Sequence, residues 1–370
     1  MEYFSKYSSN TFAAGANQLT FGTPEGESVT VRAFYRIAFG GRYNYSLLFS
    51  NTVDSTFSDG KLCHKNHVCD AWTIENALIC KVKGELPTGD LRGTGNAVNE
   101  RAGAFWPLTF TGARKKVVGP GEFFASDPQK MNFDAGDWLC LELTVSGPEI
   151  PYHEESWLPI YVKTEDGWEY TKKMPVACMI GCDRPVEKRI CYVGDSITQG
   201  IGTPVNSYLH WNAVLSEMLG DRYAYWNLGI GYGRANDLAS LGAWAYKARQ
   251  NDVIVMCYGV NDIFRIRDAE TTCRDLEICA DHFKSLGKTV ILQTVPPFNY
   301  GAEDGARWNK INGFITETLS KKVDLLFDVR EVLSDPASPE KALYGGHPNA
   351  EGNRRWAEAL YKKIKESGIL

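Results

Sequence analysis

The chain has 370 residues, 44% of them hydrophobic, and this length and composition suit two hydrophobic cores better than one. Its formal net charge is −5, from 40 basic and 45 acidic residues, so neither nucleic acid nor an anionic membrane is indicated as a partner. No stretch approaches the roughly 18 consecutive apolar residues of a membrane-spanning helix, and residues 1–6 lack the basic and apolar regions of a signal peptide. We therefore expect a cytoplasmic protein of two domains.

Short runs of aromatic and β-branched residues follow one another through the first half of the chain. They predict strands over residues 29–37, 43–50, 139–145, 160–164 and 168–170. Residues 139–145 alternate in the period of a half-buried strand, and Asp166-Gly167 between the last two runs predicts a hairpin turn. The spacing favours an all-β sandwich or jelly-roll domain over residues 1–184.

Strand-like and helix-like segments alternate in the second half. The predicted strands are 190–193, 225–228, 253–258, 290–295 and 325–329, and helices are expected at 208–219 and 349–366. Because parallel strands need crossover helices, this alternation predicts an α/β domain over residues 185–370, with a doubly wound, flavodoxin-like parallel sheet of five strands. Residues 183–185 are the expected link between the two domains.

Ten cysteines call for an explanation. Four lie in apolar strand-like or helical patterns and are expected to be core thiols: Cys191, Cys257, Cys273 and Cys279. A different group, Cys63, His64, His67 and Cys69, could supply a tetrahedral zinc set within seven residues. Its spacing is too tight for the usual zinc patterns, since the adjacent Cys63 and His64 would hardly point at one ion. We therefore expect a local loop and no metal.

Small and polar residues follow the ends of three predicted strands and precede the last helix. These segments are Gly194-Asp195-Ser196, residues 227–233, residues 259–262 and residues 346–349. Read alone, Ser196 could be the N-cap of a strand-to-helix turn. Because the carboxyl ends of parallel strands share one edge, however, Ser196 and His347 can converge there as nucleophile and base. Glycine-loosened backbone amides and Asn261 add donors for a developing oxyanion, and this combination indicates acyl transfer.

Together, these segments resemble the four sequence blocks of the SGNH, or GDSL, hydrolase family, in the family's order and from about Arg189 to the C-terminus. The resemblance implies that Ser196 is the nucleophile and His347 the base. It also implies an oxyanion hole made by Asn261 and the backbone amides of Ser196 and of Gly231 or Gly233. The N-terminal half resembles the β-sandwich of two-domain bacterial carbohydrate acetylesterases. No metal or organic cofactor is implied.

One departure from the family pattern concerns the acid that usually stands three residues before the histidine, where this chain has Tyr344. Such an acid would orient the imidazole and stabilise its charged form. Three explanations are open: a Ser196–His347 dyad held by a backbone carbonyl, an acid from elsewhere such as Asp335 or Glu351, or an inactive descendant. We favour the dyad. A further acid, Asp195, is expected to pin its own loop by hydrogen bonds to the backbone.

The expected activity is hydrolysis of short-chain, acetyl esters carried by a small molecule or an oligosaccharide. Trp308, near the glycine-rich residues 299–305, is the expected sugar-contacting residue of the cleft. One alternative keeps the chemistry but changes the substrate to a phospholipid, a thioester or a small aryl ester. Another, motivated by Tyr344, is a catalytically impaired relative that only binds carbohydrate.

Overall fold

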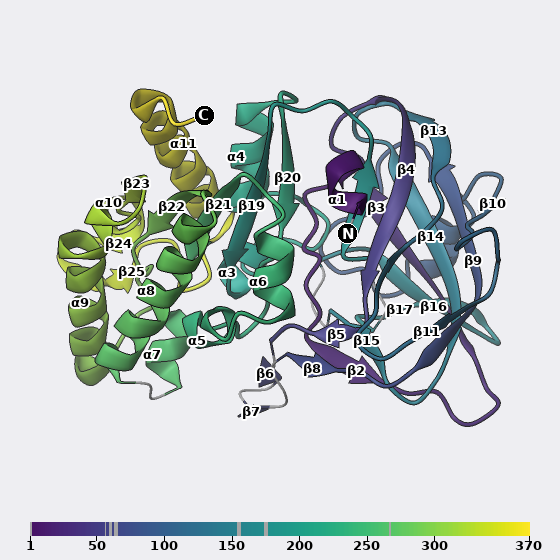
Figure 1. Ribbon diagram of the computed structural model, residues 1–370, viewed down its shortest axis with the longest axis horizontal. Helices are drawn as coiled ribbons and strands as arrows, with labels where there is room; N and C mark the ends of the chain where they lie inside the picture. Colours follow the sequence, from purple (N-terminus) through teal and green to yellow (C-terminus); the bar gives the residue numbers. More distant parts are fainter. Residues whose placement is uncertain are drawn as a thin grey trace.

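A computed structural model describes residues 2–55, 57–58, 61–62, 66–153, 157–173, 177–265 and 268–370. Two units lie side by side, a β-rich unit built from the first half of the chain and an α/β unit built from the second (Figure 1). The chain passes from one to the other over residues 183–187, between the last strand of the β-rich unit and the first strand of the α/β unit.

The β-rich unit consists mainly of antiparallel strands. Its elements in chain order are α1 (Tyr3–Lys6), β1 (Ser8–Ser9), β2 (Leu19–Phe21), β3 (Val29–Arg36), β4 (Gly41–Ser50), β5 (Thr52–Val53), β6 (Phe57–Ser58), β7 (Lys61–Leu62), β8 (His67–Val68), β9 (Trp72–Val82), α2 (Gly95–Asn99), β10 (Trp106–Pro107), β11 (Lys116–Val118), β12 (Phe123–Ala125), β13 (Gln129–Phe133), β14 (Trp138–Ser146), β15 (Ile150–Tyr152), β16 (Ile160–Thr164), β17 (Gly167–Tyr170) and β18 (Met179–Cys182). The predicted strands correspond to β3, β4, β14, β16 and β17, and the predicted hairpin joins β16 to β17.

Two larger sheets dominate this unit. One has the order β1-β18-β4-β12, with β13 also on β4; the other has the order β10-β9-β14-β3-β16-β17, with β11 also on β9. Side chains of the two sheets meet, since Trp72 of β9 lies 6.3 Å from Phe124 of β12 between ring centroids. The prediction of a β-rich first half is confirmed, while the jelly-roll topology stays a prediction.

The α/β unit is built around a parallel sheet. Its elements are β19 (Lys188–Gly194), α3 (Ser196–Gln199), α4 (Trp211–Leu219), β20 (Tyr223–Asn227), α5 (Ala235–Ala239), α6 (Ala243–Ala248), β21 (Val253–Cys257), α7 (Val260–Phe264), α8 (Ala269–Ser285), β22 (Thr289–Gln293), α9 (Ala302–Glu317), η1 (Leu319–Lys321), β23 (Leu325–Phe327), α10 (Arg330–Leu333), β24 (Ser334–Asp335), β25 (Ser338–Ala342) and α11 (Ala350–Ser367). The main sheet has the order β20-β19-β21-β22-β23 with every pair parallel, which confirms the predicted doubly wound fold.

Helices cover both faces of the parallel sheet (Figure 1). On one face α4 packs against α11, where the indoles of Trp211 and Trp356 stack with centroids 4.9 Å apart. The prediction that the first of these helices begins at residue 208 was wrong. Tyr208 has a positive φ of 55° and His210 is extended, so the chain becomes helical only at Trp211.

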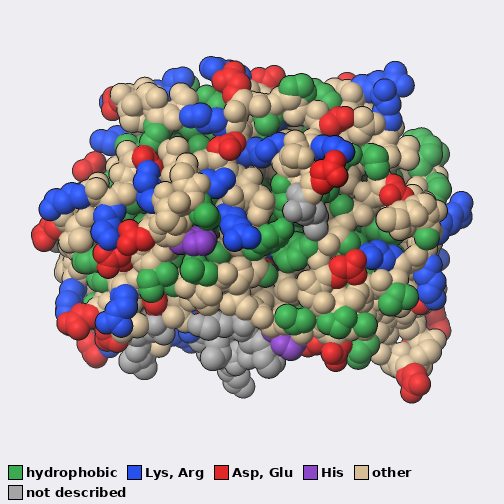
Figure 2. Space-filling model, viewed as in Figure 1, with side chains coloured by type: hydrophobic (Ala, Val, Ile, Leu, Met, Phe, Trp, Pro, Cys, Tyr) green, Lys and Arg blue, Asp and Glu red, His purple; other side chains and the backbone are tan. Residues whose placement is uncertain are grey.

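Charges of both signs are interspersed over the face shown in Figure 2, in keeping with the small net charge. Within the described ranges, no helix is long and apolar enough to cross a bilayer. The four cysteines expected in the core are all buried: Cys191, Cys257, Cys273 and Cys279.

Candidate active site

Ser196 begins α3, directly after the carboxyl end of β19. The turn between them is tight, because a Cβ on Gly194 would lie 2.1 Å from Thr198 Oγ1 and 2.7 Å from the Cys257 carbonyl oxygen. Asp195 caps the helix, accepting a hydrogen bond of 3.0 Å from the Ile197 amide. Between residues 190 and 200, all of which the structure describes, Ser196 alone is not fully buried. Ser196 is thus partly exposed at the sheet edge where open α/β sheets bind ligands.

The imidazole of His347 meets this hydroxyl, with 2.8 Å between Ser196 Oγ and His347 Nε2. His347 comes from the segment between β25 and α11, where Asn349 caps α11 by accepting a hydrogen bond from the Gly352 amide. The loop after α3 packs against the backbone of the histidine. A Cβ on Gly202 would lie 2.9 Å from the His347 carbonyl oxygen, so the two backbone segments are in direct contact. A nucleophile and a base in hydrogen-bond contact are therefore present.

No ion pair or hydrogen bond joins His347 to a carboxylate among the residues that the structure describes. Glu351 instead pairs with Arg354 and Arg355, and Asp335 accepts the Ala337 amide. Tyr344, at the position of the family's acid, contributes its carbonyl to the Asn349 amide. Burial lowers the pKa of the His347 imidazole below its ordinary value, with no acidic neighbour opposing that shift. This environment favours the neutral, proton-accepting imidazole.

Asp195 lies beneath the serine and does not contact His347. It is only 3% exposed, and burial together with the neighbouring Asp262 charge raises the pKa of its carboxyl to about 7. Its bond to the Ile197 amide holds the start of α3 in place. This placement matches the loop-pinning role expected for Asp195.

Candidate donors for an oxyanion lie in the loops after β20 and β21, the two strands that flank β19. The Gly233 amide donates to the Ile230 carbonyl at 3.0 Å and so closes a turn, whereas the Gly231 amide makes no hydrogen bond within the described part of the chain. Asn261 Nδ2 donates to the Gly233 carbonyl at 3.2 Å, which fastens α7 to this loop. Ser196 heads a helix, so its amide has no intrahelical partner either. The amides of Ser196 and Gly231 and the second amide hydrogen of Asn261 are the available donors.

An aromatic wall stands beside His347, and the sequence patterns did not single it out. The Phe298 ring lies edge-on to the imidazole with centroids 5.1 Å apart, and Phe264 follows at 5.2 Å from Phe298. Phe264 is 39% exposed and so offers an apolar surface to a substrate. Both residues lie in or beside loops at the carboxyl ends of strands, a location that could have suggested them.

Trp308 does not occupy the place expected of it. Its side chain is 1% exposed, and its indole donates to the carbonyls of Val295 and Pro296 at 2.9 and 3.1 Å. Trp308 lies on the buried side of α9. An indole whose N–H is bonded to buried carbonyls can also bury its ring. The expectation of a sugar-stacking Trp308 is therefore corrected.

The β-rich unit contacts the loop that follows the serine. Trp157 Nε1 donates to the Thr203 carbonyl at 2.8 Å, the Asn206 side chain donates to the Pro87 carbonyl at 3.0 Å, and the Gly89 amide donates to the Val205 carbonyl at 2.9 Å. Residues of the β-rich unit therefore contact the loop over residues 203–206, which follows α3.

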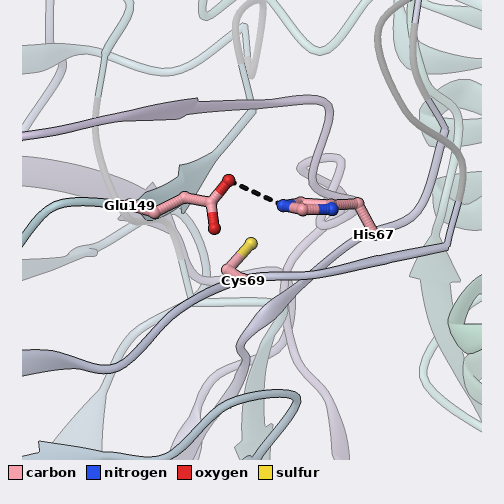
Figure 3. Close-up of side chains that lie close together, drawn as sticks. All are labelled: His67, Cys69 and Glu149. Carbon is pink, nitrogen blue, oxygen red and sulfur yellow. Dashed lines mark hydrogen bonds and ion pairs between the residues drawn. The ribbon is translucent and has the colours of Figure 1, made fainter.

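A second cluster of polar side chains lies in the β-rich unit, where Figure 3 shows His67, Cys69 and Glu149 together. Their potential ligand atoms lie within 4.8 Å of one another. The Glu149 carboxylate contacts His67 Nε2 at 2.6 Å and accepts the Asp70 amide at 2.8 Å, so protein groups already occupy both of its oxygens. Burial, with a contribution from Glu149, raises the pKa of the Cys69 thiol to about 12. The hydrogen bonds of this cluster therefore join β8 to the segment before β15.

The zinc set weighed from the sequence shares two members with this cluster, His67 and Cys69. The other two, Cys63 and His64, lie outside the described residues. The third side chain of the cluster, Glu149, is distant in sequence and was not part of that set.

The five-stranded parallel sheet, with its serine at the end of β19, has the SGNH hydrolase fold. Residues 192–355 match the GDSL-like Lipase/Acylhydrolase family, so this part of the chain is a GDSL acylhydrolase domain. No curated protein matches the chain.

Several solved structures are similar to about half of the chain. They include a GDSL-like lipase from Bacteroides thetaiotaomicron (16% identity, TM-score 0.40, covering 50% of this chain and 92% of that one). The aryl esterase of M. smegmatis is similar at 16% identity and a TM-score of 0.38, covering 48% of this chain and 99% of that one. A carbohydrate acetylesterase from Sinorhizobium meliloti also has 16% identity and a TM-score of 0.38, covering 49% and 99%.

Proposed function

We propose that this protein is a serine esterase that removes short acyl groups, acetyl above all, from carbohydrate esters. The observation that carries the proposal is the 2.8 Å contact between Ser196 Oγ and His347 Nε2, in an acylhydrolase domain whose Gly231 amide has no hydrogen-bond partner among the described residues. No metal or organic cofactor has a role in this chemistry.

In the proposed mechanism His347 Nε2 takes the proton from Ser196 Oγ as that oxygen attacks the ester carbonyl carbon. The carbonyl oxygen becomes an oxyanion, which the amides of Ser196 and Gly231 and the side chain of Asn261 stabilise. The imidazolium then gives its proton to the departing alcohol, leaving an acyl-enzyme. Water, deprotonated by His347, attacks the acyl carbon and releases the carboxylic acid with Ser196 restored.

Two structural features support the choice of substrate. The Phe298 ring packs against the backbone beside His347, where a Cβ on Gly346 would be 3.1 Å from the ring, so this side of the site is filled. The β-rich unit contacts the loop that follows the serine through Trp157 and through the Pro87 carbonyl, which accepts from Asn206, and this suits an alcohol part larger than a simple alkyl group. We therefore assign the short acyl group to the hydrolase domain and the sugar to the boundary between the units.

A panel of p-nitrophenyl esters tests the preference for acyl length. We expect kcat/KM to fall by at least about 10-fold from acetate to octanoate, because a filled pocket penalises each added methylene by about 1–3 kcal/mol. Acetate release from acetylated xylo-oligosaccharides, measured beside the matched butyrylated sugars, tests the carbohydrate part. A preference for octanoate would favour the lipase alternative, and inertness toward every ester would favour the binding-only alternative.

The pH dependence of kcat/KM tests how His347 is held. Because burial lowers the pKa of this imidazole from its ordinary 6.5, the neutral base persists to lower pH. We expect kcat/KM to rise with pH through an apparent pKa below 6.5 and then to level off at neutral pH. A carboxylate partner would favour the imidazolium and raise that value, so an apparent pKa of 7 or more would argue against the dyad.

A further inference from the structure

The N-terminal segment of the chain runs between the two units, as the purple trace in Figure 1 shows. Ala14 forms a parallel bridge with Asn227 at the end of β20, and the Gly15 amide donates to the Asn227 carbonyl at 3.0 Å. On its other side the segment touches the β-rich unit, since a Cβ on Gly15 would lie 2.0 Å from the Cys178 carbonyl oxygen. This segment therefore lies against the strand whose following loop carries Gly231.

Gln18 ends this segment with its side chain on that loop. Its Nε2 donates to the Gly231 carbonyl at 2.9 Å, across 213 positions of sequence. Gln18 is 1% exposed and Gly231 is also buried, so the bond is shielded from water. The contact is close, because a Cβ on Gly231 would lie 3.3 Å from Gln18 Nε2.

The loop holds the two peptide planes around Gly231 by different means. The first plane joins Ile230 to Gly231, and its carbonyl accepts the Gly233 amide at 3.0 Å. In a trans peptide the N–H points opposite to the C=O, so the Gly231 N–H is turned away from that turn. The second plane carries the Gly231 carbonyl, and Gln18 holds it from the β-rich unit. The loop itself therefore orients the Gly231 N–H, and Gln18 orients the next peptide plane of the same turn, which carries the Gly231 carbonyl.

We propose that Gln18 is a positioning residue for the oxyanion hole, so that the β-rich half of the chain completes the catalytic apparatus of the hydrolase domain. This inference rests on the function proposed above. Without the Gln18 donor, a buried carbonyl would lack a partner, and a glycine loop is free to rotate until that carbonyl finds another. Rotation of that plane changes the backbone dihedral angles on both sides of it, so the turn that holds the Gly231 N–H shifts and displaces this donor from the position that the oxyanion takes.

The expected effect falls on the transition state and not on ground-state binding. Loss of one oxyanion donor costs about 10²–10³-fold in kcat, and a displaced donor should cost somewhat less. For Gln18→Met, which keeps the length of the side chain and removes the donor, we expect kcat to fall by about 10- to 100-fold with KM within about twofold. Gln18→Glu, whose ionised carboxylate cannot donate, should behave in the same way at pH 8.

The matched control is Ser55→Ala. Ser55 Oγ also makes a buried hydrogen bond between the two units, donating to Asp237 Oδ2 at 2.8 Å, but Asp237 keeps its bonds to Arg234 when that hydroxyl is lost. Steady-state kinetics with p-nitrophenyl acetate and thermal unfolding by circular dichroism are measured for all variants. We expect Ser55→Ala to keep the wild-type kcat, even where its melting temperature falls as far as that of Gln18→Met.

The outcomes separate this inference from the proposed function. If the wild type is active, Ser196→Ala is inert and folded Gln18→Met and Gln18→Glu keep kcat within twofold, Gln18 has no positioning role and the esterase assignment stands. If Ser55→Ala loses kcat as strongly as the Gln18 variants, the contact is general interface packing, which also overturns the inference. If the wild type hydrolyses no ester, or if Ser196→Ala is as active as the wild type, the proposed function itself is refuted.

Discussion

Replacing Ser196 with alanine is expected to lower kcat for p-nitrophenyl acetate by at least about 10³-fold, because covalent catalysis ends when the nucleophile is lost. Ser196 is partly exposed, and within the described part of the chain its hydroxyl makes one side-chain hydrogen bond, at 2.8 Å to His347, so the variant should fold normally. What remains after the substitution is the weaker assistance of the oxyanion donors to attack by water.

Ser207→Ala is the appropriate control for this experiment. Ser207 lies in the same loop region, eleven positions after Ser196, and its hydroxyl accepts the Leu209 amide at 3.4 Å without contact to His347. Ser207→Ala should keep kcat within about twofold, as expected for a surface substitution away from the chemistry. Equal activity of the Ser196→Ala variant and the wild type would show that another group attacks the ester.

The second large effect concerns stability. Lys247 of α6 and Asp54 of the β-rich unit form an ion pair with 2.5 Å between Nζ and Oδ2, and both side chains are 0% exposed. Burial disfavours the charged ammonium, but Asp54 and Cys178 together more than offset this and raise the pKa of Lys247. Lys247→Met should lower the free energy of unfolding by about 3–5 kcal/mol, because it leaves the Asp54 carboxylate buried without a compensating charge. Urea unfolding at pH 7 measures this loss.

Two further variants define the cause of that loss. Lys284→Met removes a cation of the same kind whose pair with Asp324 is about one-third exposed, and it should cost no more than about 1 kcal/mol. Adding Asp54→Asn to Lys247→Met removes the stranded charge and should recover part of the stability. A Lys247→Met variant within about 1 kcal/mol of the wild type would contradict a major role for this pair in joining the two units.

Local patterns predicted strands well where one face alternates or the whole run is apolar, and poorly where the backbone is irregular. β9 was missed although it is an interior strand of its sheet, paired on both sides. Its pairing with β14 shifts register, so that Thr144 faces Asn76 and Val145 faces Ile74, with Glu75 left between them. Such a bulge breaks the two-residue alternation from which strands are predicted. The prediction that Trp308 contacts a sugar failed for another reason. Whether an indole is buried depends on partners for its N–H that lie elsewhere in the chain.

By itself the sequence determined the parallel sheet, the serine turn after its first strand and the presence of a histidine and an asparagine near the same edge. These follow from short-range signals, namely apolar strands, glycine-rich turns and the rule that parallel strands end on one side. The tertiary structure decided which of the two loop glycines keeps its amide unengaged, that Phe298 and no described carboxylate stands beside His347, and that Gln18 reaches Gly231. No local pattern carries those facts, because each depends on contacts between segments that only the folded chain brings together.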